Sequence, residues 1–207
     1  MLLFELIQVK NTEQNIDQHD TMAMKKSYVK DIQSRAGKSI GAYGKYDRLS
    51  SEPKMGIKTS IRDNPEDKDA YYQYIKAVSQ VSSENPFFPR VYDIKTIRDK
   101  NNRITYDIKI EHLNELNSLS KEELFRMAKR LFVNVDVYGF DSHTFGAMVR
   151  DAAYGKKDIR DENLKDAIQL INYIRKKYDF ENDINWKNIM IRRTNLGYQL
   201  VITDPLS

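Results

Sequence analysis

Three polar residues near the end of the chain, Asp183, Asn188 and Asp204, have the side-chain types that phosphoryl transfer requires. That chemistry uses a carboxylate beside the attacking hydroxyl group, an amide oxygen that ligates magnesium, and a second carboxylate that bridges magnesium to the phosphates. Asp183 lies five residues before Asn188, so a single loop can present both side chains. An Asp/Asn-rich turn beside a hairpin would explain the same residues without chemistry.

A predicted hairpin brings two of these residues to one place. The apolar strand "NIMI" opens with Asn188, the chain turns at Asn195 to Gly197, and the strand "LVITD" returns to end at Asp204. Asn188 and Asp204 then lie at the same open end of paired strands. From there they could ligate one metal ion.

The stretch "AGKSIGAYGKY" (residues 36–46) contains two overlapping patterns for holding phosphate. The first, "GKS", is the end of a P-loop. A P-loop needs a glycine five residues earlier, after a buried strand, and Ile32 occupies that position in a charged segment. Without that glycine the backbone cannot wrap around phosphates, so the P-loop interpretation is rejected.

The second pattern is G-x-G-x-x-G-x-V, a glycine-rich loop that covers nucleotide phosphates. Ser39, Gly41, Gly44 and Tyr46 occupy its four fixed positions, and Tyr43 lies at the tip. Glycine suits such a loop because the backbone must bend tightly and come close to phosphate. A plain hairpin turn with two glycines would also account for the stretch.

A lysine on a following strand would complete a phosphate site. Lys58 in "KMGIKTS" follows Gly56 and Ile57, as in the V-A-I-K pattern, although it could equally be a surface lysine of an edge strand. An acid on the next helix should hold this lysine. Three acids are candidates, namely Glu66, Asp67 and Asp69, and the first two could instead interact only with the helix dipole.

The elements that must position these residues follow an α+β order, with strands first, then helices, then a short hairpin. Residues 39–59 predict strands around a glycine turn. A helix over residues 63–81 is predicted to be capped by Asn64, with Pro65 in its first turn. Residues 134–162 show no clear period and stay unassigned. The other predicted elements are a hairpin over 90–113, a helix over 118–132 with a capping box from Ser120 to Glu123, and a helix over 162–178.

Composition narrows the class of protein. The chain has 207 residues, of which 40% are hydrophobic, so it can form a globular core. Its net charge of +4 gives no strong indication of nucleic-acid binding. Cysteine is absent, which excludes disulfides and suits a reducing cytoplasm. The apolar runs are too short to span a membrane, and the first residues lack the features of a signal peptide.

The C-terminal part resembles the catalytic and metal-binding loops of the protein kinase-like superfamily. It is most similar to the small early protein kinases of T7-like bacteriophages, through "NIM" after the loop and "ITDP-S" at Ile202 to Ser207. Upstream, "EDKDAYYQYIKAV" and "FPRVYDI" resemble the helix and next strand of that group. The resemblance covers residues 39–207. It implies a bilobal fold with ATP in the cleft, an antiparallel N-lobe sheet with one helix, and a mostly helical C-lobe.

The resemblance also implies a function. A phage-type serine/threonine kinase would transfer the ATP γ-phosphate to host bacterial proteins, with magnesium, in the cytoplasm of an infected cell. Asp183 would be the catalytic base, and Lys58 would bind the ATP phosphates. Asn188 and Asp204 would hold magnesium. The other nucleotide-binding positions would be Ser39, Gly41, Tyr43, Gly44, Glu66, Asp67 and a hinge from Glu111 to Leu113.

The expected organisation is an N-terminal extension over residues 1–35, an N-lobe over 36–113 and a truncated C-lobe over 114–207. Several positions depart from the family pattern. Ser39 replaces the first glycine of the loop, Glu181 and Asn182 stand where many kinases have histidine and arginine, and Pro205 follows the metal Asp. The helices that hold a peptide substrate in eukaryotic-type kinases are not expected, so residues 134–162 or the N-terminal segment would recognise the substrate.

Two alternatives remain open. The first is a pseudokinase, a kinase-shaped module that binds a host defence or transcription protein and inhibits or redirects it. The second is a small-molecule kinase of the aminoglycoside phosphotransferase type, which shares a D-[LI]-x-x-x-N loop but usually has a long helical lobe after the metal Asp. Trp186, inside the predicted loop, is expected to be a packing anchor or a substrate platform.

Overall fold

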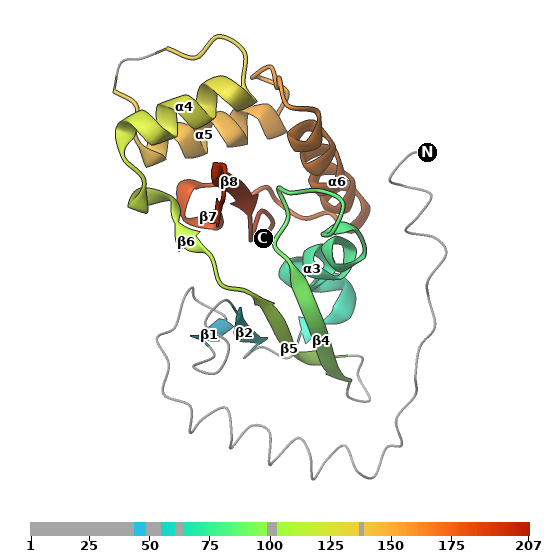
Figure 1. The fold of residues 1–207 in the computed structure, drawn as a ribbon. Coiled ribbons are helices and arrows are strands. Elements are labelled where there is room, and N and C mark those ends of the chain that lie inside the picture. The colour runs from blue at the N-terminus through green and yellow to red at the C-terminus, as the bar shows by residue number, and fades with distance from the viewer. Residues whose placement is uncertain (1–43, 49–54, 61–63, 99–102, 137–138) are drawn as a thin grey trace. The chain divides into compact units, whose positions relative to one another are not determined.

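The structure is a computed structural model that describes residues 44–48, 55–60, 64–98, 103–136 and 139–207. Within these residues the chain is α+β, with two antiparallel sheets and four α-helices (Figure 1). It forms two compact units. The first contains the described residues up to Glu66 together with Val91–His112, and the second contains Asp67–Arg90 and Leu113–Ser207.

The first unit is built around one long central strand. Strand β5 pairs along one edge with β2 and β3 and along the other edge with β4, and β1 pairs with the outer side of β2. Its strands are β1 (Gly44–Arg48), β2 (Met55–Ser60), β3 (Asn64–Pro65), β4 (Val91–Arg98) and β5 (Arg103–Glu111). Tyr106, Ile108 and Ile110 alternate along β5 and are buried, as expected for a sheet with one covered face. The predicted β4–β5 hairpin is confirmed.

The start of the helix predicted over residues 63–81 is wrong. Asn64 and Pro65 are extended, because they form β3 and pair with β5. A 3₁₀ turn follows over Glu66–Lys68, and helix α3 runs over Ala70–Val81. The N-cap is Asp69, whose carboxylate accepts the backbone N–H of Tyr72 at 2.9 Å. Because Asn64 is paired in the sheet, the helix begins later, and its N-cap is Asp69, five residues after the expected one. Aspartate and asparagine are both preferred at N-caps.

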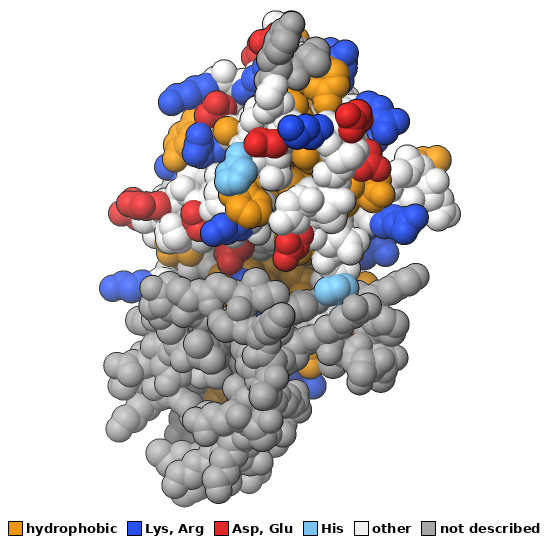
Figure 2. All heavy atoms as spheres, turned by 90° about the vertical axis from the view of Figure 1, so that its left-hand side faces the viewer, with side chains coloured by type: hydrophobic (Ala, Val, Ile, Leu, Met, Phe, Trp, Pro, Cys, Tyr) orange, Lys and Arg blue, Asp and Glu red, His pale blue; other side chains and the backbone are white. Residues whose placement is uncertain are grey.

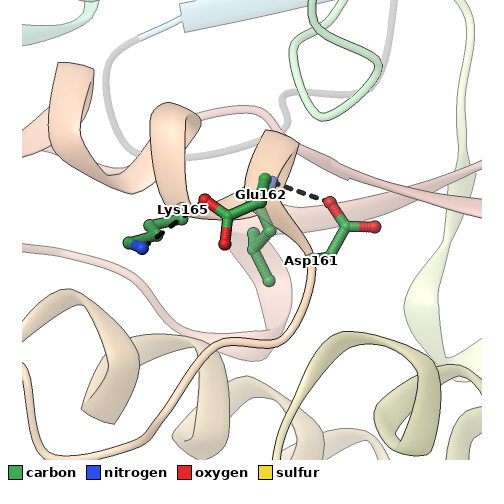
Figure 3. A network of polar contacts seen from close by, with 4 residues as sticks. Asp161, Glu162 and Lys165 are labelled. Carbon is green, nitrogen blue, oxygen red and sulfur yellow. Dashed lines mark hydrogen bonds and ion pairs between the residues drawn. The ribbon is translucent and has the colours of Figure 1, made fainter.

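Three further helices belong to the second unit. They are α4 (Lys121–Leu131), α5 (Ser142–Ala153) and α6 (Glu162–Tyr178), and each packs against the next. The predicted capping box of α4 is confirmed: Glu123 N–H donates to the Ser120 hydroxyl at 3.3 Å, and Ser120 N–H donates to the Glu123 carboxylate at 2.8 Å. Helix α6 has the predicted bounds. Asp161 caps its first turn, where Glu162 and Lys165 form an exposed ion pair (Figure 3).

Helix α5 occupies the segment for which the sequence predicts no element. Its buried residues are Phe145, Gly146, Val149, Ala152 and Ala153. These positions follow the i, i+1, i+4, i+7 and i+8 spacing of one helical face. That face meets α4, α6 and the loop before β7. Gly146 within the segment weakens the helical signal in the sequence. Of the helices that the structure describes, none combines the length and the apolar character needed to cross a membrane.

The second sheet forms the centre of the second unit. It contains β6 (Asn114–Glu115), β7 (Ile189–Thr194) and β8 (Gly197–Ile202) in the order β6–β7–β8. The predicted turn of the β7–β8 hairpin is confirmed, and Gly197 adopts φ 114°, which favours glycine. Ile189, Ile191 and Leu200 are fully buried and anchor the hairpin. The hairpin thus fixes both strand ends that flank the predicted site.

Candidate functional site

The loop between α6 and β7 brings Asp183 and Asn188 into direct contact. The Asn188 side-chain amide donates to the Asp183 carboxylate at 3.0 Å and to the Asp183 backbone carbonyl at 2.8 Å. The Asn185 side-chain amide makes the same pair of contacts, at 3.1 Å and 3.0 Å. The two amides bond different carboxylate oxygens. The five-residue spacing seen in the sequence is therefore a hydrogen-bonded pair in the structure.

Short local hydrogen bonds explain why this loop folds as it does. The side-chain oxygen of Asn182 accepts the N–H of Ile184 at 2.9 Å, and that of Asn185 accepts the N–H of Lys187 at 2.9 Å. Such Asx turns are the local alternative to regular structure that asparagine favours. Ile184 is buried and anchors the loop, whereas Asp183 is exposed.

The residues on either side of Asp204 tie it to the same loop. Thr203 donates its backbone N–H and its hydroxyl to the Asn188 carbonyl, at 2.9 Å and 3.0 Å. The N–H of Asp183 donates to the Pro205 carbonyl at 2.8 Å. Because Asp204 lies between Thr203 and Pro205, its backbone is held beside both Asp183 and Asn188. The three predicted residues are thus brought together within one unit.

The last residues of the chain extend this contact. Glu181 and Ser207 exchange two backbone hydrogen bonds, at 2.8 Å and 3.2 Å, and Asn182 pairs with Leu206 in an isolated β-bridge. The Leu206 side chain is buried. A short antiparallel pairing therefore fixes the start of the loop against the residues that follow Asp204.

Tyr74 of α3 lies close to the same strand end. Burial raises the pKa of its hydroxyl well above the ordinary value of 10.0, and the negative charge of Asp204 raises it further. The hydroxyl therefore stays neutral and acts as a donor, and it bonds the Ile202 carbonyl at 2.6 Å.

Helix α5 packs closely against the loop, and sequence reasoning missed it. A Cβ atom on Gly146 would lie 2.7 Å from the backbone nitrogen of Trp186, so the contact requires glycine. The Trp186 ring lies 4.7 Å from the ring of His143, at a tilt of 48°. In the sequence, Gly146 was the signal that another backbone could approach this segment closely. The backbone contact supports the packing role expected for Trp186.

Of the predicted nucleotide-binding residues that the structure describes, Gly44, Lys58, Glu66 and Glu111 belong to the first unit, and Asp67 and Leu113 belong to the second. Lys58 lies in the middle of β2, opposite Tyr46 on one side and Ile108 on the other. Gly44 begins β1, and Glu111 is the buried last residue of β5. Ser39, Gly41 and Tyr43 lie outside the described residues. The role of the glycine-rich stretch therefore stays a prediction.

The candidate acids for Lys58 differ in their surroundings. Glu66 is buried in the 3₁₀ turn, whereas Asp67 is exposed. Asp69 has a structural role, because it caps α3. Leu113 is buried and begins the second stretch of the second unit. The pairing of Lys58 with one of these acids stays a prediction.

The donor set at the loop suits a hard cation. In the described residues, no group of three or more His, Cys, Asp and Glu side chains could hold a metal on its own. The Asn188 side-chain amide nitrogen donates to Asp183, which leaves the side-chain oxygen as an acceptor, while the Asn188 backbone carbonyl accepts from Thr203, the residue before Asp204. An amide oxygen with one carboxylate matches magnesium that is bound partly through substrate phosphates.

Neither the described residues on one face of the protein nor the comparisons with known proteins indicate a partner. On the face drawn in Figure 2, Lys and Arg side chains are interspersed with Asp and Glu side chains. No protein-family model matches the chain, and no curated protein matches its sequence.

Proposed function

We propose that this chain is a phage-type serine/threonine protein kinase that transfers the ATP γ-phosphate to host bacterial proteins in the cytoplasm of an infected cell. The observation that supports the proposal most strongly is the contact between Asp183 and Asn188, with the backbone of Asp204 tied to both. The types and the order of these three residues in the sequence match the needs of phosphoryl transfer, and their backbones lie together in the second unit.

Asp183 would orient the attacking hydroxyl and accept its proton on a carboxylate oxygen. The amides of Asn185 and Asn188 hold this carboxylate at one orientation, and the side chain remains exposed to an incoming hydroxyl. Each oxygen accepts one amide hydrogen bond, so lone pairs remain for the substrate. A positioned carboxylate of this kind contributes about 10²–10⁴ in rate.

Asn188 and Asp204 would hold magnesium through the amide oxygen and the carboxylate. When bound, magnesium neutralises charge on the transferring phosphoryl group. The pairing of Thr203 with Asn188 keeps the two ligands at one end of the β7–β8 hairpin. Lys58 would bind the nucleotide phosphates, helped by Ser39, Gly41, Tyr43, Gly44 and one of the acids Glu66 and Asp67, and Glu111 to Leu113 would face adenine.

A second candidate is a pseudokinase that binds a host protein without transferring phosphate. The observation that favours it is the pair of amide hydrogen bonds to the Asp183 carboxylate, which give this side chain a structural role within its own loop. In a binding module Asp183 would stabilise the loop, and its loss would lower stability without removing any catalysis.

Phosphoryl transfer measured with γ-labelled ATP and magnesium separates the two candidates. The wild type is expected to label its own serine or threonine residues, identified by phosphoamino-acid analysis. Asp183→Ala should transfer phosphate about 10²–10⁴-fold more slowly and retain ATP binding. Asp166→Ala, an exposed aspartate of α6, is the matched control and should retain the wild-type rate. A wild type that binds ATP but transfers nothing to itself or to host lysate would replace the kinase with the binding module.

A further inference from the structure

The hydroxyl of Tyr74 joins α3 to the strand that leads to Asp204. Tyr74 is fully buried, and its hydroxyl donates to the Ile202 carbonyl at 2.6 Å. Ile202 is the last residue of β8, two positions before Asp204. The Phe88 ring packs edge-on against the Tyr74 ring, with 6.4 Å between centroids, and restricts its orientation.

The end of β8 is held on both edges. On the inner edge, Thr203 donates twice to the Asn188 carbonyl at the start of β7. On the outer edge no strand of the described residues follows, and Ile202 instead donates its N–H to the Phe87 carbonyl at 2.8 Å and accepts a hydrogen bond from the Tyr74 hydroxyl. With the Tyr74 hydroxyl on its carbonyl and Phe87 on its N–H, both backbone polar groups of Ile202 are hydrogen-bonded.

We propose that Tyr74 is a positioning residue for Asp204, acting through the Ile202 carbonyl to hold that carboxylate where magnesium binds. The proposal rests on the proposed function, since it assigns a supporting contact to the same metal site. Residues that orient a metal ligand typically change metal affinity by about 10–100-fold when they are replaced. The electrostatic effect of Asp204 on Tyr74 agrees with their being near each other.

A purely structural tyrosine would behave differently. A buried hydroxyl that only satisfies a carbonyl contributes to the stability of the fold, and its loss lowers the melting temperature. It does not change the magnesium affinity of the molecules that remain folded. The magnesium midpoint, measured well below the melting temperature, therefore separates positioning from packing.

The experiment is a magnesium titration of ATP binding by the full chain, using a fluorescent ATP analogue. Four proteins are compared: wild type, Tyr74→Phe, Asp204→Asn and Tyr154→Phe. The last is a control, because Tyr154 is exposed at the end of α5. Tyr74→Phe should raise the magnesium concentration at half-saturation about tenfold or more. Asp204→Asn should abolish the magnesium dependence, and Tyr154→Phe should match the wild type.

The outcomes distinguish the two claims. A wild-type midpoint in Tyr74→Phe, with magnesium dependence lost in Asp204→Asn, overturns the positioning role and leaves the proposed function standing. Unchanged magnesium dependence in Asp204→Asn overturns the proposed function itself. If Tyr74→Phe does not fold, 4-aminophenylalanine at position 74 supplies a weaker N–H donor in the same place. Its midpoint should then exceed the wild-type value, and an unchanged midpoint would overturn the proposal.

Discussion

An aspartate lies near each end of helix α6, and the two carboxylates accept different kinds of hydrogen bond. At its start, Asp161 accepts the backbone N–H of Leu164 at 3.0 Å, an N-cap like those of Asp69 and Asp141 on α3 and α5 (Figure 3). Beyond its other end, the Asp183 carboxylate accepts side-chain amides from Asn185 and Asn188. As an N-cap, the carboxylate supplies an acceptor for a backbone N–H that has no partner within the helix. At Asp183 the neighbouring side-chain amides instead orient the carboxylate.

We therefore expect the cap aspartates to contribute to stability and the residues around Asp183 to contribute to the proposed activity. Replacing a cap should destabilise the fold and leave phosphoryl transfer by the folded molecules unchanged. Replacing the groups around Asp183 should reduce transfer more than it reduces stability.

The largest effect is expected for Asn188→Ala. The change removes one amide from the Asp183 carboxylate and also removes the proposed amide ligand of magnesium. Transfer from ATP should fall about 100-fold or more, measured as initial rates with labelled ATP. Asn163→Ala, an exposed position in the first turn of α6, serves as the control at the other end of the helix. Equal rates for the two variants would remove the distinction between the two ends.

The loop also depends on α5, through Gly146. A methyl group at this position would lie within 3 Å of Trp186 backbone atoms, so Gly146→Ala should lower the free energy of unfolding by about 1–3 kcal/mol, and Gly146→Ser by more. Urea denaturation measures both. In an unhindered helix the alanine would instead stabilise by about 0.5–1 kcal/mol, and that sign would contradict the close contact.

A smaller effect is expected at the cap of α6. Asp161→Ala removes the acceptor of the Leu164 N–H and should lower the free energy of unfolding by about 1 kcal/mol. Asp161→Asn keeps an acceptor and should lose less. The transfer rate per folded molecule should stay at the wild-type value for both variants. A fall in that rate like the one expected for Asn188→Ala would show that the cap also serves the site.

The smallest effect concerns pH and Asp141. The backbone N–H of Thr144 lowers the pKa of this carboxyl below its ordinary value of 3.8, and the Thr144 side chain lowers it further. A carboxyl whose pKa is lower in the folded state stabilises the fold at pH values above its ordinary pKa. That stability is lost as the pH falls through the pKa of the folded state. Asp141→Asn should therefore flatten the decline of melting temperature in acid. An unchanged acid limb would show that the cap makes no such contribution.

Local signals in the sequence predicted much of this fold. The capping box from Ser120 to Glu123, the amphipathic period of α6 and the Asn195–Gly197 turn each lie within one element, and all are confirmed. The start of α3 was predicted wrongly because pairing of Asn64 with β5 is a long-range contact. Helix α5 was missed although its buried residues lie on one helical face, because Gly146 within the segment weakens the helical signal.

The candidate site shows the same limit. The order and spacing of Asp183, Asn188 and Asp204 were readable in the sequence, because one loop and the hairpin that follows it connect them. The contact from Tyr74 and the packing of Gly146 on the loop come from segments distant in the sequence. Residue patterns within one segment do not predict contacts between segments that are far apart in the sequence.

The most direct test of the central claim is the thermal stability of the chain with ATP, in the presence of magnesium and of a chelator, for wild type and Asp204→Asn. At 100 times its dissociation constant, a ligand that binds the native state adds about 2.7 kcal/mol to the free energy of unfolding. The wild type is predicted to gain this stabilisation only when magnesium is present, and Asp204→Asn is predicted to lose the magnesium-dependent part. A wild type that melts at one temperature in all conditions, or a variant stabilised equally by magnesium and ATP, would contradict the account.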